Sequence, residues 1–61
     1  MKRYVKEFAA DEIASLKAAY KDFGNPAALE RIPKIERIIS ACKRGMITDR
    51  EAVRRIANPA E

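Results

Sequence analysis

The side chains in this sequence that could do chemistry are a few carboxylates, a few hydroxyls and one thiol. Asp11 and Glu12 are adjacent, and Asp49 and Glu51 are two residues apart. Side chains with either spacing do not face each other on a helix, so neither pair converges as a general acid and a general base would. The absence of His excludes a Ser or Cys nucleophile paired with an imidazole base. We therefore expect no catalytic residues and no enzyme activity.

Metal and cofactor sites are also expected to be absent. A zinc site needs several Cys or His ligands, and the sequence offers Cys42 alone. The acidic residues do not follow the spacing of a calcium-binding loop. Cys42 stands with Ile35, Ile38 and Ile39 in an apolar helical stripe, which favours a buried, unreactive thiol over a nucleophile. We expect no cofactor, and no small-molecule substrate is indicated.

The charge of the chain is moderately positive and lies in one half. Thirteen Lys and Arg residues against nine Asp and Glu residues give a net charge of +4 over 61 residues. Residues 1–30 hold five basic and five acidic side chains, whereas residues 31–61 hold eight and four. This asymmetry is compatible with an anionic partner such as nucleic acid, although we favour an ordinary solvated surface that keeps a small protein in solution.

The element that would position the N-terminal residues is a long helix over about 3–23. Six of its apolar residues fall within an arc of about 80° when a helix turns by about 100° per residue. They are Val5, Ala9, Ile13, Leu16, Tyr20 and Phe23. Glu12 interrupts this stripe, so it should lie at an exposed edge or pair with a cation of another element. Phe8 widens the stripe on one side. The candidate residues for contact with a partner are Val5, Phe8, Ile13, Leu16, Tyr20 and Phe23.

A second helix is predicted over about 26–44. Gly24 suits a left-handed C-terminal cap of the first helix, and Asn25-Pro26 suits the start of the next, so the turn spans about two residues. Pro33 lacks a backbone N–H and its ring collides with the carbonyl four residues earlier. We therefore expect a break or kink near Ile32.

A third, short helix is predicted over about 49–57. Gly45 caps the second helix, and Thr48-Asp49-Arg50-Glu51 forms a capping box. In that box the Thr48 hydroxyl accepts from the Glu51 N–H, and the Glu51 carboxylate reaches back to the Thr48 N–H. Asn58-Pro59 ends the helix, and no alternating β-branched run predicts a strand. The expected fold is all-α, with one domain over residues 1–61.

The stretch from Ile35 to Ile56 resembles the short helical hairpins known as SHOCT-type C-terminal domains. Those domains carry an apolar helix, then a Gly, an Ile-Thr pair and a Glu that opens a second short helix. The matching positions are Ile35, Ile38, Ile39, Gly45, Ile47, Thr48 and Glu51. The resemblance implies oligomerisation or docking to a partner, without catalysis. The whole chain also resembles small orphan proteins encoded by phages and prophages, which have no settled activity.

A helix-turn-helix unit that binds DNA is the alternative interpretation of the same hairpin. The cations that would contact DNA are Lys43, Arg44, Arg50, Arg54 and Arg55. Arg50 and Arg54 are one helical turn apart and share a face, as a groove-reading helix requires. Asp49 and Glu51 would oppose the phosphates, so DNA binding is the less favoured interpretation.

The function expected from the sequence is that of a non-enzymatic interaction module. A chain of this length buries only about 60% of the surface that its unfolded form exposes, and small domains often complete their core by association. We expect a homodimer, a higher oligomer or a complex with another helical protein. No apolar run approaches the roughly 18 residues of a membrane span, and no apolar stretch follows the basic start as in a signal peptide. With a single Cys, these features predict a cytoplasmic protein without a membrane partner.

Overall fold

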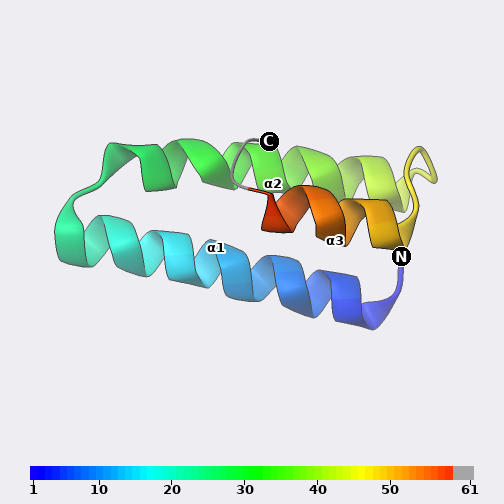
Figure 1. Ribbon diagram of the computed structural model, residues 1–61, viewed down its shortest axis with the longest axis horizontal. Helices are drawn as coiled ribbons and strands as arrows, with labels where there is room; N and C mark the ends of the chain where they lie inside the picture. Colours follow the sequence, from blue (N-terminus) through cyan, green and yellow to red (C-terminus); the bar gives the residue numbers. More distant parts are fainter. Residues whose placement is uncertain (59–61) are drawn as a thin grey trace.

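The computed structural model describes residues 1–58, which form three α-helices (Figure 1). Helix α1 spans Arg3–Phe23, α2 spans Pro26–Lys43 and α3 spans Asp49–Ala57. α2 runs back alongside α1, and α3 packs against both while running in the direction of α1. The described residues contain no strand, so the predicted all-α fold of three helices is confirmed.

The turn between α1 and α2 is built as its sequence predicts. Gly24 has a left-handed backbone with φ of 64°, and its N–H donates to the Tyr20 carbonyl at 2.8 Å. The side-chain oxygen of Asn25 accepts from the Ala27 N–H at 3.1 Å. Pro26 occupies the first position of α2, where a backbone N–H would have no acceptor within the helix. Two residues therefore separate the helices, and α2 must fold back on α1.

Gly45 ends α2 by a related arrangement. Its φ is 77°, and its N–H donates to the Cys42 carbonyl at 3.0 Å while the Met46 N–H donates to the Ala41 carbonyl at 3.0 Å. This pair of bonds is the Schellman motif, which requires a residue that tolerates positive φ. No heavy atom lies within 4 Å of the place where a Cβ on Gly45 would stand, so the backbone conformation alone favours glycine.

Of the break or kink expected near Ile32, the break is wrong, because α2 is one continuous helix of 18 residues with Pro33 inside it. Pro33 is exposed, so its ring lies on the solvent side of the helix. Ala28 before it and Ile35 after it are both buried. Burial on both sides of the proline holds the helix together and outweighs the loss of one backbone hydrogen bond.

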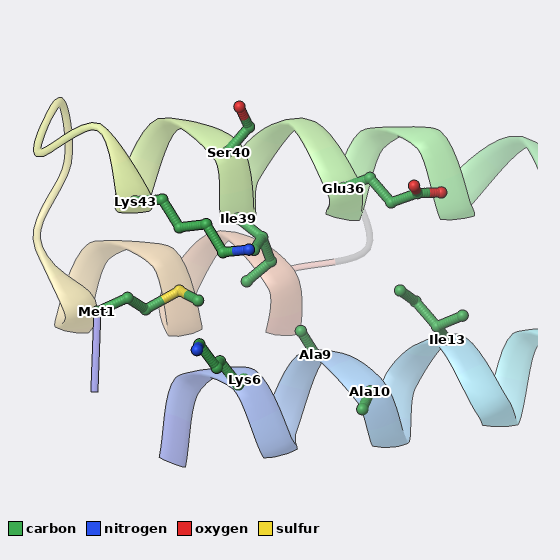
Figure 2. Close-up of a pocket in the computed structure, with 9 residues that line it drawn as sticks. All are labelled: Met1, Lys6, Ala9, Ala10, Ile13, Glu36, Ile39, Ser40 and Lys43. Carbon is green, nitrogen blue, oxygen red and sulfur yellow. The ribbon is translucent and has the colours of Figure 1, made fainter. Parts of the chain in front are cut away.

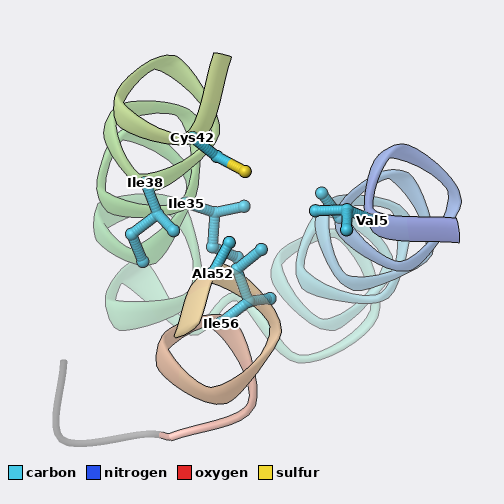
Figure 3. Packing of buried hydrophobic residues seen from close by; sticks show 7 residues of the cluster. Val5, Ile35, Ile38, Cys42, Ala52 and Ile56 are labelled. Carbon is cyan, nitrogen blue, oxygen red and sulfur yellow. The ribbon is translucent and has the colours of Figure 1, made fainter. Parts of the chain in front are cut away.

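The core lies where all three helices meet. Its buried members are Val5 and Ala9 of α1, Ile35, Ile38 and Cys42 of α2, and Ala52 and Ile56 of α3. Figure 3 shows six of them pointing toward the space between the helices. Val5, Ile35 and Ile56 are the largest side chains that water does not reach. The burial of Cys42 among the isoleucines agrees with the sequence prediction.

Helix α3 is too short to cover the full length of the other two helices. It has 9 residues, against 21 in α1 and 18 in α2. The stripe of α1 is buried at its first residues and half-buried at Ile13 and Leu16, whereas Tyr20 and Phe23 are exposed by 44% and 84%. Helices α2 and α3 therefore cover the first part of this stripe and leave Tyr20 and Phe23, which lie beyond α3, exposed.

Candidate interaction surface

A groove runs between α1 and α2 on the side that faces away from α3 (Figure 2). Its volume is about 410 Å³. The lining residues are Met1, Lys6, Ala9, Ala10 and Ile13 on one side, and Glu36, Ile39, Ser40 and Lys43 on the other. Most of the lining is apolar or small, and the charged residues come from both helices. We call this side of α1 and α2 the two-helix face.

Two rows of side chains with a seven-residue spacing frame the two-helix face. The row on α1 is Lys6, Ile13 and Tyr20, and the row on α2 is Leu29, Glu36 and Lys43. Residues seven apart lie within about 20° of each other around a helix, so each row stays on one side of its helix. Because α1 and α2 are antiparallel, the two Lys residues share one end of the face, and Tyr20 and Leu29 belong to the other end.

The ionisable side chains of the groove are Lys6, Glu36 and Lys43, and none of them has a partner of opposite charge among the described residues. Figure 2 shows the amino groups of Lys6 and Lys43 in the gap between α1 and α2, near Met1, and the Glu36 carboxylate farther along. Within residues 1–58, no ion pair or hydrogen bond engages any of these three side chains. The groove therefore presents two cations at one end and one anion at the other, separated by apolar surface.

Large apolar side chains are exposed near the α1–α2 turn. Phe23 is 84% exposed, Tyr20 44% and Leu29 41%. Leu29 is not among the contact residues expected from the sequence. Its seven-residue spacing to Glu36 is the signal that places it on the two-helix face.

The other expected contact residues are less accessible. Val5 is fully buried in the core, so a partner docking on this fold does not reach it. Phe8, Ile13 and Leu16 are half-buried and pack against the core. Of these three, Ile13 also lines the groove, and it is the one that the two-helix face presents to a partner.

A second hollow lies where α3 ends. It has a volume of about 400 Å³, and residues of all three helices line it, among them Glu12, Leu16 and Ile56. Glu12 is half-buried there, and no ion pair within residues 1–58 engages it. Of the two alternatives for Glu12, the edge position therefore holds, and water reaches this carboxylate through the hollow.

Arg31 fixes the C-terminal end of α3 beside this hollow. Its Nη2 donates to the carbonyl oxygens of Ile56 at 2.8 Å and Asn58 at 2.6 Å, and lies 3.3 Å from that of Arg55. The last carbonyls of a helix have no backbone N–H to accept from, and they form the negative end of the helix dipole. A guanidinium donates hydrogen bonds to these carbonyls, and its positive charge is favourable at this end. Sequence analysis missed this role because Arg31 is at least 24 residues away from every carbonyl that it binds.

Asp49 joins the start of α3 to the other two helices. Its Oδ1 accepts from the Cys42 thiol at 3.2 Å, and its Oδ2 accepts from the backbone N–H of Lys2 at 3.3 Å. Burial and, after it, the hydrogen bond to the Asp49 carboxylate raise the pKa of the Cys42 thiol. The thiol therefore stays protonated at neutral pH, which makes Cys42 a packing residue.

Glu51 completes only half of the predicted capping box. Its N–H donates to the Thr48 hydroxyl at 3.1 Å, as predicted. Its carboxylate does not reach back to the Thr48 N–H within the described chain, because Arg54 and Arg55 occupy it. Arg54 donates to the carboxylate at 2.6 and 3.0 Å, and Arg55 donates at 3.0 Å. These hydrogen bonds lower the pKa of Glu51 to about 2.

The five cations of the DNA-binding alternative lie on different sides of the molecule. Lys43 is in the groove, which faces away from α3. Arg44 and Arg50 are exposed at the second turn and at the start of α3. Arg54 and Arg55 farther along α3 share one acidic partner. In addition, α2 and α3 run side by side (Figure 1), whereas the helices of a DNA-reading hairpin cross at about 90–120°.

Comparisons with protein-family models, curated proteins and solved structures find no match to this chain. The resemblance to SHOCT-type hairpins and to phage orphan proteins stays a prediction. No helix of residues 1–58 combines the length and apolarity needed to cross a membrane. The same residues bring together no three His, Cys, Asp or Glu side chains that could hold a metal ion.

Proposed function

We propose that this protein is a non-enzymatic helical interaction module, which docks to a partner through the apolar surface of α1 and α2 that α3 leaves uncovered. The single observation that carries the proposal is the exposure of Phe23 by 84%, with Tyr20 and Leu29 exposed nearby. Large aromatic side chains in water are unfavourable for an isolated chain but are typical anchors of interfaces.

The partner surface is helical and largely apolar. The two-helix face offers two parallel rows of side chains with a seven-residue spacing, which is the pattern that another helix or helix pair packs against. Acting as a binding module in the cytoplasm requires no bound metal, cofactor or nucleophile. Two of the three arginines of α3 already pair with Glu51, which speaks against phosphate as their partner.

Site-specific photocrosslinking in cells that produce the protein tests the proposal. A benzophenone amino acid is placed at Phe23, at Tyr20 or at Leu29, and at Arg37 as the control, because Arg37 is exposed on α2 outside both rows. We expect the three test positions to give one crosslinked product of the same mass and the control to give none. Products from the control alone, or none at any of the three test positions, would overturn the proposal.

A further inference from the structure

We propose that the partner of the two-helix face is a second copy of this chain, packed antiparallel so that the Lys43 end of one copy lies over the Glu36 end of the other. The inference rests on the proposed function and names the partner at the groove end of the two-helix face. Tyr20 and Leu29, about 15 Å along the helices from the centre of this contact, and Phe23 lie beyond the second copy, so its docking leaves them exposed. The groove ends of α1 and α2 of both copies stack face to face as a four-helix bundle, with α3 on the outer side of each copy. The groove then becomes the centre of a shared core.

The charges of Glu36 and Lys43 favour a second copy as the partner and determine the direction in which its helices run. Lys43 and Glu36 are seven residues apart on α2, which is about 10 Å along the helix axis. A twofold axis perpendicular to the helices, passing between these residues, places each Lys43 opposite Glu36 of the second copy. The pairing occurs twice, and it supplies the partner that each of these side chains lacks in the single chain.

Other ways of facing two copies bring like charges together. A parallel arrangement places Lys6 and Lys43 over the same two lysines of the second copy. An antiparallel arrangement whose twofold axis passes through Glu36 places the Glu36 carboxylates of the two copies against each other. Like charges directly opposed in an interface are strongly unfavourable, so the register between Glu36 and Lys43 is the one that the charges allow.

The side chains at the centre of this register are small. Midway between the charged ends, the groove is lined by Ala9 and Ala10 of α1 and by Ile39 and Ser40 of α2. Small residues allow two helix pairs to approach to about 8–10 Å between axes, so that Ile13 and Ile39 of each copy fill the space beside them. A 61-residue chain gains from this a core that its own three helices leave incomplete at the groove.

A charge-swap series tests the register in the purified, untagged protein. Sedimentation equilibrium is run from about 10 μM to about 1 mM on the wild type and on Glu36→Lys, Lys43→Glu and the double variant. Each single variant should weaken dimerisation by about tenfold or more, because it opposes like charges at two symmetric places. The double variant should return the dissociation constant to within about threefold of the wild-type value. Failure of the double variant to restore the dimer would overturn the register.

A steric pair of variants locates the interface independently of charge. Ala10 lines the groove, whereas Ser15 is exposed on the opposite side of α1, about 140° around the helix. Arg is a good helix former, so Ala10→Arg and Ser15→Arg should both keep the helical circular dichroism of the wild type. Ala10→Arg should abolish the dimer and Ser15→Arg should leave it intact. A dimer that survives Ala10→Arg overturns the proposal, as does loss of the dimer in both variants.

The outcomes separate this inference from the proposed function. A wild type that stays monomeric up to about 1 mM leaves the groove without a second copy, and a single crosslinked product at Tyr20 or Leu29 of a mass other than two copies then assigns the two-helix face to a different protein. That result overturns the second-copy proposal and leaves the interaction module standing. A monomer that also gives no product at Phe23, Tyr20 or Leu29 overturns both.

Discussion

Arg31 carries a larger part of this fold than its position in the sequence suggests. It is the side chain of α2 that holds the last carbonyls of α3, and α3 contributes only Ala52 and Ile56 to the buried core. Periodicity and capping rules relate residues that are close in the chain, so they predicted the Asn25 cap and the Thr48 hydroxyl bond. They carry no information on a contact between Arg31 and Asn58.

Replacing Arg31 with Met retains an unbranched apolar stem but removes the charged donors. We expect the free energy of unfolding to fall by about 1–3 kcal/mol, because partly buried carbonyls lose hydrogen bonds from a charged group. Urea denaturation followed by circular dichroism measures the change. Arg37→Met, at an exposed position of the same helix, should lie within about 0.5 kcal/mol of the wild type. Equal losses in both variants would contradict the capping role.

Glu51 gives the stability of the protein an acid-dependent part. Its pKa is about 2 in the folded protein, against an ordinary value of 4.5. A carboxylate with a lowered pKa contributes stability that is present above the unfolded value and is lost as the pH falls toward the folded one. We expect this contribution to disappear between about pH 4.5 and pH 2.

Urea unfolding at a series of pH values, with Glu51→Gln beside the wild type, measures the contribution of Glu51. The wild type should be the more stable of the two at pH 6, and the difference should shrink as the carboxylate is protonated. Glu30→Gln, at an exposed position of α2, is the matched control and should follow the wild type throughout. A difference between Glu51→Gln and the wild type that is the same at pH 6 and pH 2 would refute the assignment.

At the scale of the elements, the capping signals predicted the helix ends well, whereas the prediction for the interior of α2 failed. Gly24, Asn25 and Gly45 occupy the conformations that their types favour, so the predicted ends agree with the structure to within one residue. The break or kink at Pro33 was predicted only from the lost backbone hydrogen bond and the clash of the proline ring. The burial of Ala28 and Ile35 on either side outweighs this local cost, and that burial depends on contacts with α1 and α3.

Replacing Pro33 with Ala should therefore stabilise the protein. Ala restores the N–H that can donate to the Leu29 carbonyl and removes the ring that crowds it, although it also returns some freedom to the unfolded chain. We expect a gain of about 1–2 kcal/mol in the free energy of unfolding, measured in urea. Lys34→Ala is the control for a gain in helix propensity alone. No gain, or a loss, would mean that the ring of Pro33 makes a contact worth more than the restored hydrogen bond.

At the scale of the whole molecule, the sequence predicted which residues are apolar and aligned but not which of them are covered. The stripe of α1 is equally regular at Val5 and at Phe23, yet the first is fully buried and the second is 84% exposed. The difference comes from the length of α3 relative to α1, and from which side of the α1–α2 pair α3 occupies. Both are properties of three packed helices. The groove was missed for the same reason, since its lysines come from residues 37 positions apart.

The contrast between core and uncovered surface is measurable. Ile56→Ala should lower the free energy of unfolding by about 2–4 kcal/mol, a large share of the roughly 3–9 kcal/mol expected for a domain of this length. Phe23→Ser should change it by less than about 0.5 kcal/mol, because Phe23 makes few contacts to lose. Thermal unfolding of both variants and the wild type, measured at one low protein concentration, gives the two changes in the free energy of unfolding. A strong destabilisation by Phe23→Ser would show that this ring packs in the single chain.

The first two residues of the chain lie against the rest of the fold. Met1 lines the groove, and the backbone N–H of Lys2 is bonded to Asp49. Anything joined ahead of Met1 therefore emerges into the groove beside Lys43, whose pairing with Glu36 of a second copy sets the proposed register. An amino-terminal affinity tag or fluorescent fusion would obstruct the contact that it was attached to detect, and assays of self-association are best made with this end unmodified.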